Sequence, residues 1–448
     1  MKKTNETIKT TLRMALPAIV ESFFICFAGL VDSFMVSSLG PAAVVSVGLT
    51  AQPKFLGLAV FSAISVALSA LIARRYGEKE RDKANSILFT AIIMIIVLSL
   101  LIGTLMTVFA SPIIRLCGSN NDTHAGATLY FKIIMSCMIF NCLQIGINAV
   151  QRGAGNTKIT MRTNVTSNTV NVILNYLLIG GKFGFPALGI RGAAIATVLG
   201  TVVSCTMSVL SIMKRDCFTN IHYIIENKIR PSMAALTNIV KVGYSIFLEQ
   251  LLLRVGFMSC AIMAAKQGTA PMAAHQVCSH ILSLSFAFGD GLQHAAVALI
   301  GRSLGEKNHA LAKEYGNACQ KIGGFISIIL VVVFFASSRW IMSLFFPNDK
   351  DIADIGVSIM YALVISVLLQ IRQCIYMGSL RGAGDTKFTA FASAFSVTII
   401  RTAVSYICCY PLGWGIIGIW MGVIADQITR FILSGWRFRQ GKWVDIRI

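Results

Sequence analysis

Long apolar stretches separated by short polar turns run along the whole chain. Their lengths are close to the ~20 residues that an α-helix needs to cross a hydrocarbon core of ~30 Å. The pattern predicts an all-α integral membrane protein. Its twelve expected transmembrane helices lie at residues 12–37, 47–73, 86–110, 126–150, 160–181, 188–213, 238–265, 275–301, 318–345, 352–379, 388–411 and 414–436.

Two motifs recur at a nearly constant distance along the chain. RGAGNTK at residues 152–158 returns as RGAGDTK at residues 381–387, 229 positions later. ALIARRYGEK at residues 70–79 returns as ALIGRSLGEK at residues 298–307, 228 positions later. Matching offsets in two separate motifs indicate an internal duplication.

The duplication predicts the domain organisation. We expect an N-lobe at residues 1–213, a cytoplasmic connecting loop at 214–237 and a C-lobe at 238–448. Each lobe would contain six helices, and because six is even, both lobes enter the membrane in the same orientation. They are therefore expected to form parallel repeats with a cleft between them, where rocking gives alternating access.

Charge placement sets the expected orientation. Of the 39 Lys and Arg residues, 27 fall in the two terminal tails and in the loops on one side, and six fall in the opposite loops. The positive-inside rule then predicts that both termini are cytoplasmic. The net charge of +20 is explained mostly by this topology, so no nucleic-acid partner is expected.

Composition supports a lipid environment and argues against enzymatic chemistry. Hydrophobic residues make up 55% of the chain and charged residues 13%, about half the charged share of a soluble domain. The twelve cysteines form no CxxC pair, so neither a metal site nor a disulfide framework is expected. HExxH, GxSxG and Walker motifs are absent. We expect a transporter without a cofactor, driven by an ion gradient of H+ or Na+.

Asp32 is the strongest single candidate for function. It lies in the first predicted span without a charged neighbour in sequence, where an ionisable group costs roughly 2.5–3.5 kcal/mol on insertion scales. The alternative is a hydrogen-bonded structural acid. The position 228 residues later is Cys260, so this acid is confined to the N-lobe.

Four asparagines in the fifth predicted span are spaced 4, 3 and 4 residues apart and form one polar stripe on a helix. The stripe is predicted to be a hydrogen-bonding wall opposite Asp32, for protons, ions or water. Asn171 and Asn175 lie deepest in the span and are the candidates to test. The alternative is inter-helix hydrogen bonding. The stripe consists of Asn164, Asn168, Asn171 and Asn175.

Further candidates for substrate contact carry charge or amide groups. Glu21 and Glu249 are 228 positions apart, and we expect them to flank the cleft and meet a cationic substrate. The alternative is that both reach for the cytoplasmic interface. Arg372 and Gln373 lie in the tenth predicted span, with structural pairing as the alternative role. Lys54 is expected to lie near a span end and to reach for the interface.

Several stretches together resemble one known family. LPAIVESFFICFAGLVDSFMVSSLGPAA, NYLLIGGKFGFPALGIRGAAIAT, AAHQV, RFRQGKW and the paired motifs above are similar, in order, to the multidrug and toxic compound extrusion (MATE) family. They fit its bacterial NorM-like and DinF-like branches. The resemblance implies a V-shaped, two-lobe antiporter of a bacterial cytoplasmic (inner) membrane, which exports amphipathic, often cationic compounds in exchange for H+ or Na+.

The resemblance also implies roles for individual residues. Asp32 matches the family's coupling acid in the first span, and a Na+ site using Asp32 with Asn171 and Asn175 stays open. Some relatives have an aspartate where Asn175 stands. A sodium site in the C-lobe is not expected, because the acid of the tenth span is missing, with Gln373 nearby. A monomer suffices for this architecture.

A flippase for lipid-linked saccharides is the alternative function. Related two-lobe families perform that reaction, and it requires a strongly cationic cleft to hold pyrophosphate. Arg254, Arg372 and Arg401 are the residues in the predicted spans that keep this alternative open.

Overall fold

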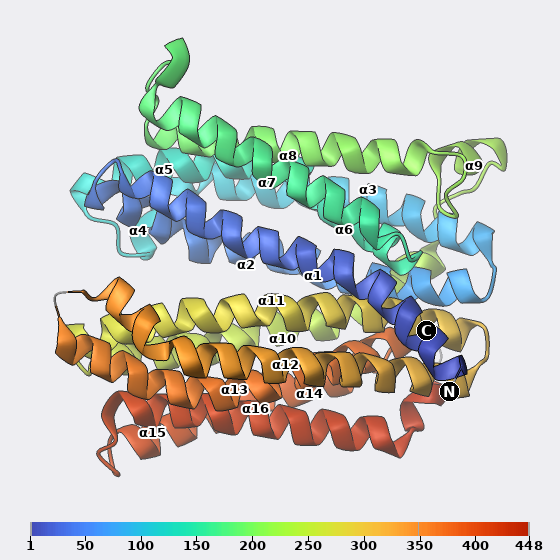
Figure 1. The fold of residues 1–448 in the computed structure, drawn as a ribbon. Helices are drawn as coiled ribbons and strands as arrows, with labels where there is room; N and C mark the ends of the chain where they lie inside the picture. The colour runs from blue at the N-terminus through green and yellow to red at the C-terminus, as the bar shows by residue number, and fades with distance from the viewer. Residues whose placement is uncertain (1, 348, 447–448) are drawn as a thin grey trace. The chain divides into compact units, whose positions relative to one another are not determined.

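The computed structural model describes residues 2–347 and 349–446, and within these ranges it contains helices but no β-strand. Three short irregular helices are η1 (Lys182–Gly184), the π-helix η2 (Phe395–Arg401) and η3 (Lys442–Asp445). The α-helices are labelled in Figure 1 and comprise α1 (Lys2–Ser37), α2 (Pro41–Gly77), α3 (Arg81–Val108), α4 (Ala110–Leu116), α5 (Asn121–Ser136), α6 (Met138–Gly153), α7 (Thr157–Gly180), α8 (Ile190–Met213), α9 (Ile221–Glu226), α10 (Met233–Ala265), α11 (Thr269–Gly305), α12 (His309–Phe345), α13 (Lys350–Ala383), α14 (Thr386–Ala394), α15 (Thr402–Cys409) and α16 (Gly415–Gln440).

The predicted all-α membrane fold is confirmed, and each predicted span falls on a helical segment. Among the described residues, nine helices are long and apolar enough to cross a membrane, or ten if α5 and α6, bent by 50° at Cys137, count as one. Neither α7 nor α11 meets this criterion, because polar side chains such as the asparagine stripe dilute their apolar character. The count of twelve crossings therefore stays a prediction.

The outward faces of the helices are apolar. Val97 and Leu101 on α3, and Phe325 and Val332 on α12, are each 56–66% exposed. Soluble proteins rarely expose apolar patches of this extent, whereas lipid tails solvate them. The exposed faces thus agree with the membrane environment that hydropathy predicts.

The described chain divides into two compact units. We call Phe23–Gly243 the N-terminal unit, and the part up to Ser22 together with the part from Tyr244 onward the C-terminal unit. The predicted lobe boundaries differ from this division, because α1 and α10 each run from one unit into the other. Ala15 and Ile19 of α1 belong to the same apolar core as Leu292 of α11. A Cβ on Gly291 would lie 2.5 Å from the backbone nitrogen of Ile19, so only glycine allows this approach.

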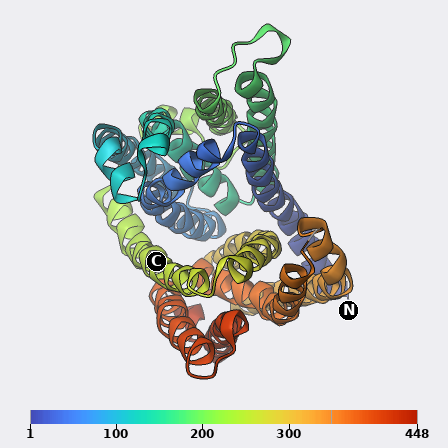
Figure 2. The ribbon, with the colours of Figure 1, turned by 90° about the vertical axis from the view of Figure 1, so that its left-hand side faces the viewer.

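In the N-terminal unit, α2 packs against α3, α5 and α6, while α7 packs along α8. Figure 2 views these helices end-on. Gly200 brings α8 close to α7, since a Cβ there would lie 2.9 Å from the carbonyl oxygen of Ser167. The Ser167 hydroxyl donates to the Gly200 carbonyl at 2.8 Å. This close contact positions the polar stripe of α7 against α8.

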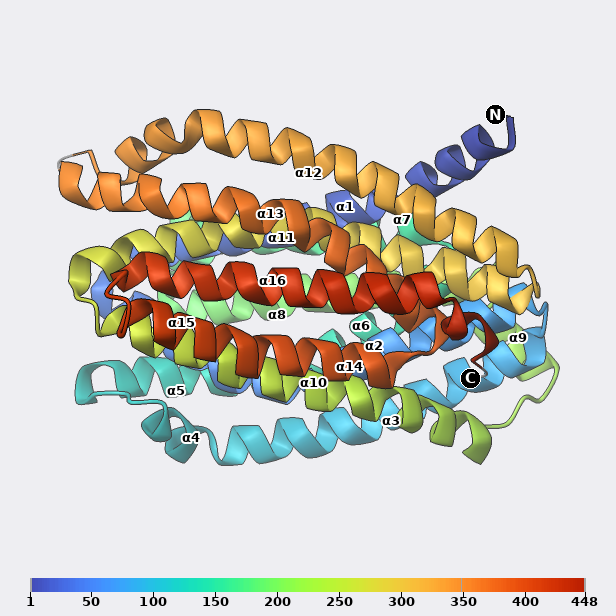
Figure 3. The same ribbon diagram turned by 90° about the horizontal axis from the view of Figure 1, so that it is seen from below.

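In the C-terminal unit, α13 packs against α11, α12 and α16, and Trp420 and Leu363 are buried in its core. Figure 3 shows α14, η2 and α15 forming one rod beside α16. The π-helical turn closes hydrogen bonds from i to i+5 and so accommodates one residue more than an α-helical turn. Positions beyond it are therefore shifted by one relative to the first half of the chain.

Candidate functional site

Asp32 lies at the centre of a polar cluster in the N-terminal unit. The Asn175 side-chain amide donates to Asp32 Oδ1 at 2.7 Å. In the amide orientation that satisfies its neighbours, Asn171 donates to Asp32 Oδ1 at 2.7 Å and Oδ2 at 3.0 Å, and its oxygen accepts from Thr197 at 3.2 Å. The prediction that Asn171 and Asn175 face Asp32 is confirmed.

Three helices build this cluster. Asn171 and Asn175 are four residues apart on α7 and therefore share one face, and they are 6% and 1% exposed. Asp32 comes from α1 and is only partly buried. Thr197 comes from α8, which Gly200 holds against α7. The carboxylate thus has two amide donors and still retains access from outside the helix bundle of its unit.

The asparagine stripe divides between two roles. Asn164 accepts a hydrogen bond from Gln144 Nε2 at 2.8 Å and so joins α7 to α6. This matches the alternative of inter-helix hydrogen bonding. Asn171 and Asn175 instead bind the carboxylate of Asp32. Spacing alone could not separate the two roles, since all four residues lie on one face.

Three residues of the site were missed by sequence reasoning. Thr197 bonds Asn171 and carries no distinctive signal in the sequence. The Tyr130 hydroxyl hydrogen-bonds the Thr197 side chain. Lys54 interacts electrostatically with Asp32. The expectation that Lys54 reaches for the interface is wrong, because Lys54 lies thirteen residues after the start of α2, Pro41–Gly77, and lines an internal pocket.

The chemistry of the cluster suits a proton or a small hard cation. Carboxylate, carboxamide and hydroxyl oxygens are the ligand types that hard cations prefer, and a carboxylate can also take up a proton. Within residues 2–347 and 349–446, no group of three or more His, Cys, Asp or Glu residues is arranged to hold a metal ion. A cation here would therefore rest on Asp32 and the amide and hydroxyl oxygens around it.

The C-terminal unit contains a repeat-related cluster. Cys260 is 228 positions after Asp32, while Ser405 and Arg401 are 230 positions after Asn175 and Asn171. The offset of 230 follows from the extra residue in η2. Glycine packing supports the same offset: Gly192 packs on Leu178 in one unit and Gly418 packs on Cys408 in the other, and Leu178 and Cys408 are also 230 positions apart. Cys260 Sγ and Ser405 Oγ lie 3.7 Å apart, in the place of the bond between Asp32 and Asn175.

The acid of this second cluster is held by two arginines. Arg401 Nη2 donates to Asp426 Oδ2 at 2.6 Å. Arg430 donates to the two oxygens of Asp426 through Nε and Nη2, both at 2.8 Å. Asp426 is 0% exposed. This carboxylate therefore has no access for an external cation.

The remaining candidates belong to the C-terminal unit. Glu249 is 2% exposed and pairs with Arg381 at 2.6 Å. Glu21 is also buried, at 4% exposed. Gln373 is buried and donates to the Cys374 thiol at 3.2 Å. The role of these residues in substrate contact stays a prediction.

Arg372 is held by its own surroundings. Its Nε donates to Gln320 Oε1 at 3.4 Å, and its guanidinium lies 5.2 Å from the centroid of the Phe431 ring. Over the part of the chain that the structure describes, no hydrogen bond or ion pair joins Arg372 or Gln373 to Glu249.

Comparison with known proteins gives consistent matches along the chain. The model of the MatE family matches residues 17–177 and 245–407. The two matched segments begin 228 positions apart and end 230 positions apart, which agrees with the offset of 228 between Asp32 and Cys260 and with that of 230 beyond η2. The probable multidrug resistance protein NorM of Thermotoga maritima is 26% identical over 446 residues, covering 98% of this chain and 93% of that protein.

Two further comparisons agree. The uncharacterized transporter YisQ of Bacillus subtilis is 24% identical, with 99% of this chain and 97% of that protein covered. Among solved structures, a MATE protein in complex with MaL6 matches with a TM-score of 0.90 at 23% identity, covering 97% of both chains. An outward-facing multidrug resistance MATE family transporter matches with a TM-score of 0.90 at 22% identity and the same coverage. At these identities, the structural matches establish the fold.

Proposed function

The chain belongs to the MatE family of multidrug efflux transporters, and on that premise we propose that it is a secondary active antiporter for small organic compounds. The compounds are amphipathic and carry a cationic group, and they leave the cell in exchange for H+ or Na+. Members of the family are transporters and not enzymes. The observation that carries the proposal is the Asp32 cluster, a membrane-embedded carboxylate with amide donors and, among the described residues, no counter-ion within ion-pair distance.

Asp32 couples the two fluxes by changing its charge. As a carboxylate it accepts hydrogen bonds from Asn171 and Asn175 and attracts a cationic compound. When Asp32 takes up a proton or a Na+ ion, that attraction is lost and the amide bonds to α7 must rearrange. The compound is then released, and the cation leaves again on the other side of the membrane.

Helix α1 can transmit this change. Pro17 lies inside α1 and interrupts its hydrogen-bond ladder. Gly29 lies one turn before Asp32 and has no neighbour within 4 Å of a Cβ placed there. Both features favour bending of a helix. A change of charge at Asp32 therefore acts on the helix that runs from one unit into the other.

Topology and assembly follow from the charge pattern and the fold. We place the protein in a bacterial cytoplasmic membrane as a multi-pass monomer surrounded by lipid, with both termini in the cytoplasm. The bias of Lys and Arg toward one side supports this orientation. Nucleic acid has no role in this mechanism.

The flippase alternative is less well supported. It requires arginines that are free to bind pyrophosphate. Arg401 is instead bound to Asp426, and Arg372 is held by Gln320 and Phe431. These contacts use two of the three guanidinium groups on which the alternative rested.

The proposal is tested in proteoliposomes. Movement of the cationic dye rhodamine 123 is followed under an imposed proton gradient and then under a sodium gradient, for wild type and Asp32→Asn. We expect gradient-driven movement in wild type and its loss in Asp32→Asn, and the more effective gradient identifies the coupling ion. Asp122→Asn is the matched control, since Asp122 is exposed in the first turn of α5. Full transport in Asp32→Asn would show that coupling lies elsewhere.

A further inference from the structure

A pocket in the N-terminal unit adjoins the Asp32 cluster. Helices α2, α5, α6 and α8 line it, and its cavity volume is about 20 Å³, which admits a small polar group rather than a whole compound. Thr197 belongs to both places, because it lines the pocket and donates to the side-chain oxygen of Asn171 in the cluster. A compound held at Asp32 therefore has this pocket beside it.

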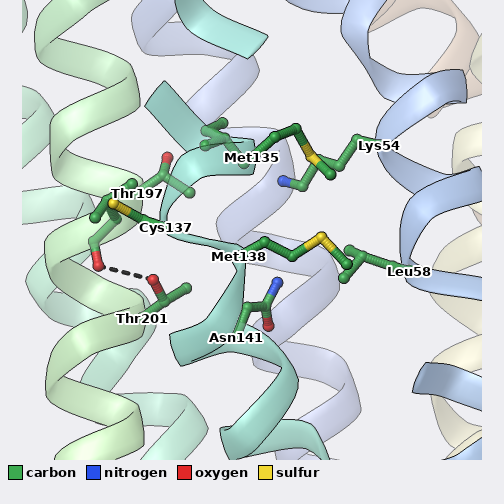
Figure 4. Close-up of a pocket in the computed structure, with 10 residues that line it drawn as sticks. Lys54, Leu58, Met135, Cys137, Met138, Asn141, Thr197 and Thr201 are labelled. Atoms are coloured by element: carbon green, nitrogen blue, oxygen red, sulfur yellow. Dashed lines mark hydrogen bonds between the residues drawn. The ribbon is translucent and has the colours of Figure 1, made fainter. Parts of the chain in front are cut away.

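Lys54 directs a positive charge at the pocket. Figure 4 shows its side chain reaching from α2 into the space between Met135 and Met138. Among the described residues, none forms a hydrogen bond with its ammonium or an ion pair within 4.0 Å. Its electrostatic partner Asp32 is beyond contact. A cation at membrane depth without a contacting partner is costly. This cost is offset if the Lys54 ammonium binds a ligand.

Two further features supply donors at the same place. Asn141 lines the pocket, and no side-chain hydrogen bond is made by its amide within the described part of the chain. The break between α5 and α6 at Cys137 places the N-terminal end of α6 at the pocket. Helix N-termini stabilise negative charge, and broken transmembrane helices commonly present them to substrates. The Lys54 ammonium, the Asn141 amide and the N-terminal end of α6 all favour binding of an acidic group.

Charge balance favours a ligand with both signs. Asp32 and Lys54 together are neutral when both are ionised, and a monocation at Asp32 leaves one uncompensated positive charge in a poorly solvated site. A compound that carries a cationic group for Asp32 and a carboxylate for Lys54 leaves no uncompensated charge in the site. Burial of an unpaired charge is far more costly than burial of a pair.

We propose that Lys54 and Asn141 form a subsite for a carboxylate group of the transported compound. The proposal rests on the proposed function, since it names the substrate class of the same site: amphipathic zwitterions in preference to simple cations. Lys54 has no counterpart in the other unit, because the position 228 residues later is Leu282. The preference therefore resides in the N-terminal unit.

Two dyes that differ in one group test the subsite. Rhodamine 110 carries a free carboxylate, and rhodamine 123 is its methyl ester. Binding of each to the purified full-length protein is measured by fluorescence anisotropy for wild type, Lys54→Met, Asn141→Ala and the control Lys132→Met, which removes an exposed lysine from the same unit. Because a hydrogen bond to a charged group contributes enough to change affinity about 10- to 100-fold, Lys54→Met should weaken rhodamine 110 by at least about tenfold. Rhodamine 123 binding should be unchanged or tighter.

The outcomes separate the subsite from the transport proposal. An equal loss of affinity for both dyes in Lys54→Met would overturn the subsite, because Lys54 would then act only through its effect on Asp32. Wild type that does not bind rhodamine 110 would overturn it as well. If Lys54→Met does not fold, Asn141→Ala gives the same discrimination with a smaller effect. Intact, Lys54-dependent binding without gradient-driven movement in vesicles would contradict the antiporter and leave the subsite standing.

Discussion

The two repeat-related clusters hold a carboxylate in opposite ways. In the N-terminal unit, Asp32 is partly exposed and bonded by the neutral amides of Asn171 and Asn175. In the C-terminal unit, the acid is Asp426, fully buried between the guanidiniums of Arg401 and Arg430. Neutral donors leave a carboxylate free to exchange a proton or a cation. Two arginines supply permanent counter-charge and remove that freedom.

The comparison shows how a duplicated site can become specialised. The change from asparagine to arginine at the position of Asn171 and Arg401 places a resident cation where the other unit has an amide. The change from Asp32 to Cys260 removes the exchangeable acid. The C-terminal cluster is then fixed by an ion-pair network. On the proposed function, these two substitutions confine ion coupling to the N-terminal unit.

Loss of the buried acid is expected to have the largest effect on stability. Asp426→Asn leaves two buried guanidiniums without a counter-charge, and breaking such a pair costs about 3–5 kcal/mol. Asp32→Asn removes a partly exposed acid and should change stability by less than about 1 kcal/mol while abolishing coupling. Thermal unfolding in detergent, followed by tryptophan fluorescence, measures both variants. Similar stability in the two would remove the proposed distinction between the clusters.

Loss of one amide should have the next largest effect. Asn175→Ala deletes the donor at 2.7 Å from Asp32 Oδ1. Because hydrogen bonds to charged groups contribute about 1.5–3 kcal/mol, the concentration of coupling ion for half-maximal transport should shift by roughly 10- to 100-fold. Transport measured across a series of gradients gives this value. The matched control is Asn168→Ala in the same stripe, and an equal shift there would assign the effect to α7 as a whole.

Tightening the packing behind the cluster should have a smaller effect. A Cβ on Gly200 would meet the Ser167 oxygen at 2.9 Å, so Gly200→Ala should destabilise the protein by about 1–3 kcal/mol. The displacement of Thr197 should also reduce transport. Gly324→Ala is the control, since no atom lies within 4 Å of that Cβ, and alanine is favoured in a helix by up to about 1 kcal/mol. A stable Gly200→Ala with normal transport would show that α8 adapts.

The smallest expected effect sharpens the comparison most directly. Cys260→Asp in the Asp32→Asn background restores an acid at the repeat-related position, but Arg401 lies beside it and will pair with the new carboxylate. We therefore expect no recovery of gradient-driven dye movement. Recovery would mean that the C-terminal cluster retains an ion site and that the arginines do not block it.

The sequence predicted the polar cluster only in part. Asp32, Asn171 and Asn175 were identifiable because charged and amide groups at membrane depth are costly and stand out against an apolar background. Lys54 carried the same signal, yet its position near a predicted span end suggested an interfacial role. Helix α2 begins at Pro41, six residues before the predicted span, so Lys54 lies well inside the helix and lines a pocket. Thr197 and Tyr130 are ordinary residues in membrane helices, and only their contacts distinguish them.

The duplication was visible in the sequence, but its breakpoint was not. Offsets of 228 and 229 positions identify the repeat. The extra residue of η2 moves the offset to 230 beyond Phe395–Arg401, so a fixed offset pairs Asn171 and Asn175 with the wrong residues. No composition signal marks a π-helix. Hydrogen bonding in the folded chain is what establishes that Arg401 and Ser405 are the counterparts.

Hydropathy, cation placement and repeated motifs thus determine the fold class, the duplication and the family. Each of these is a local property of the chain and does not depend on which helices pack together. Tertiary structure alone decides which polar groups meet. Helix packing divides the stripe on α7: Asn164 hydrogen-bonds Gln144 of α6, whereas Asn171 and Asn175 hydrogen-bond Asp32. Ion pairing likewise decides that Asp426 is held between arginines while Asp32 is bonded by neutral amides, because the energy of a buried charge depends on neighbours from other helices.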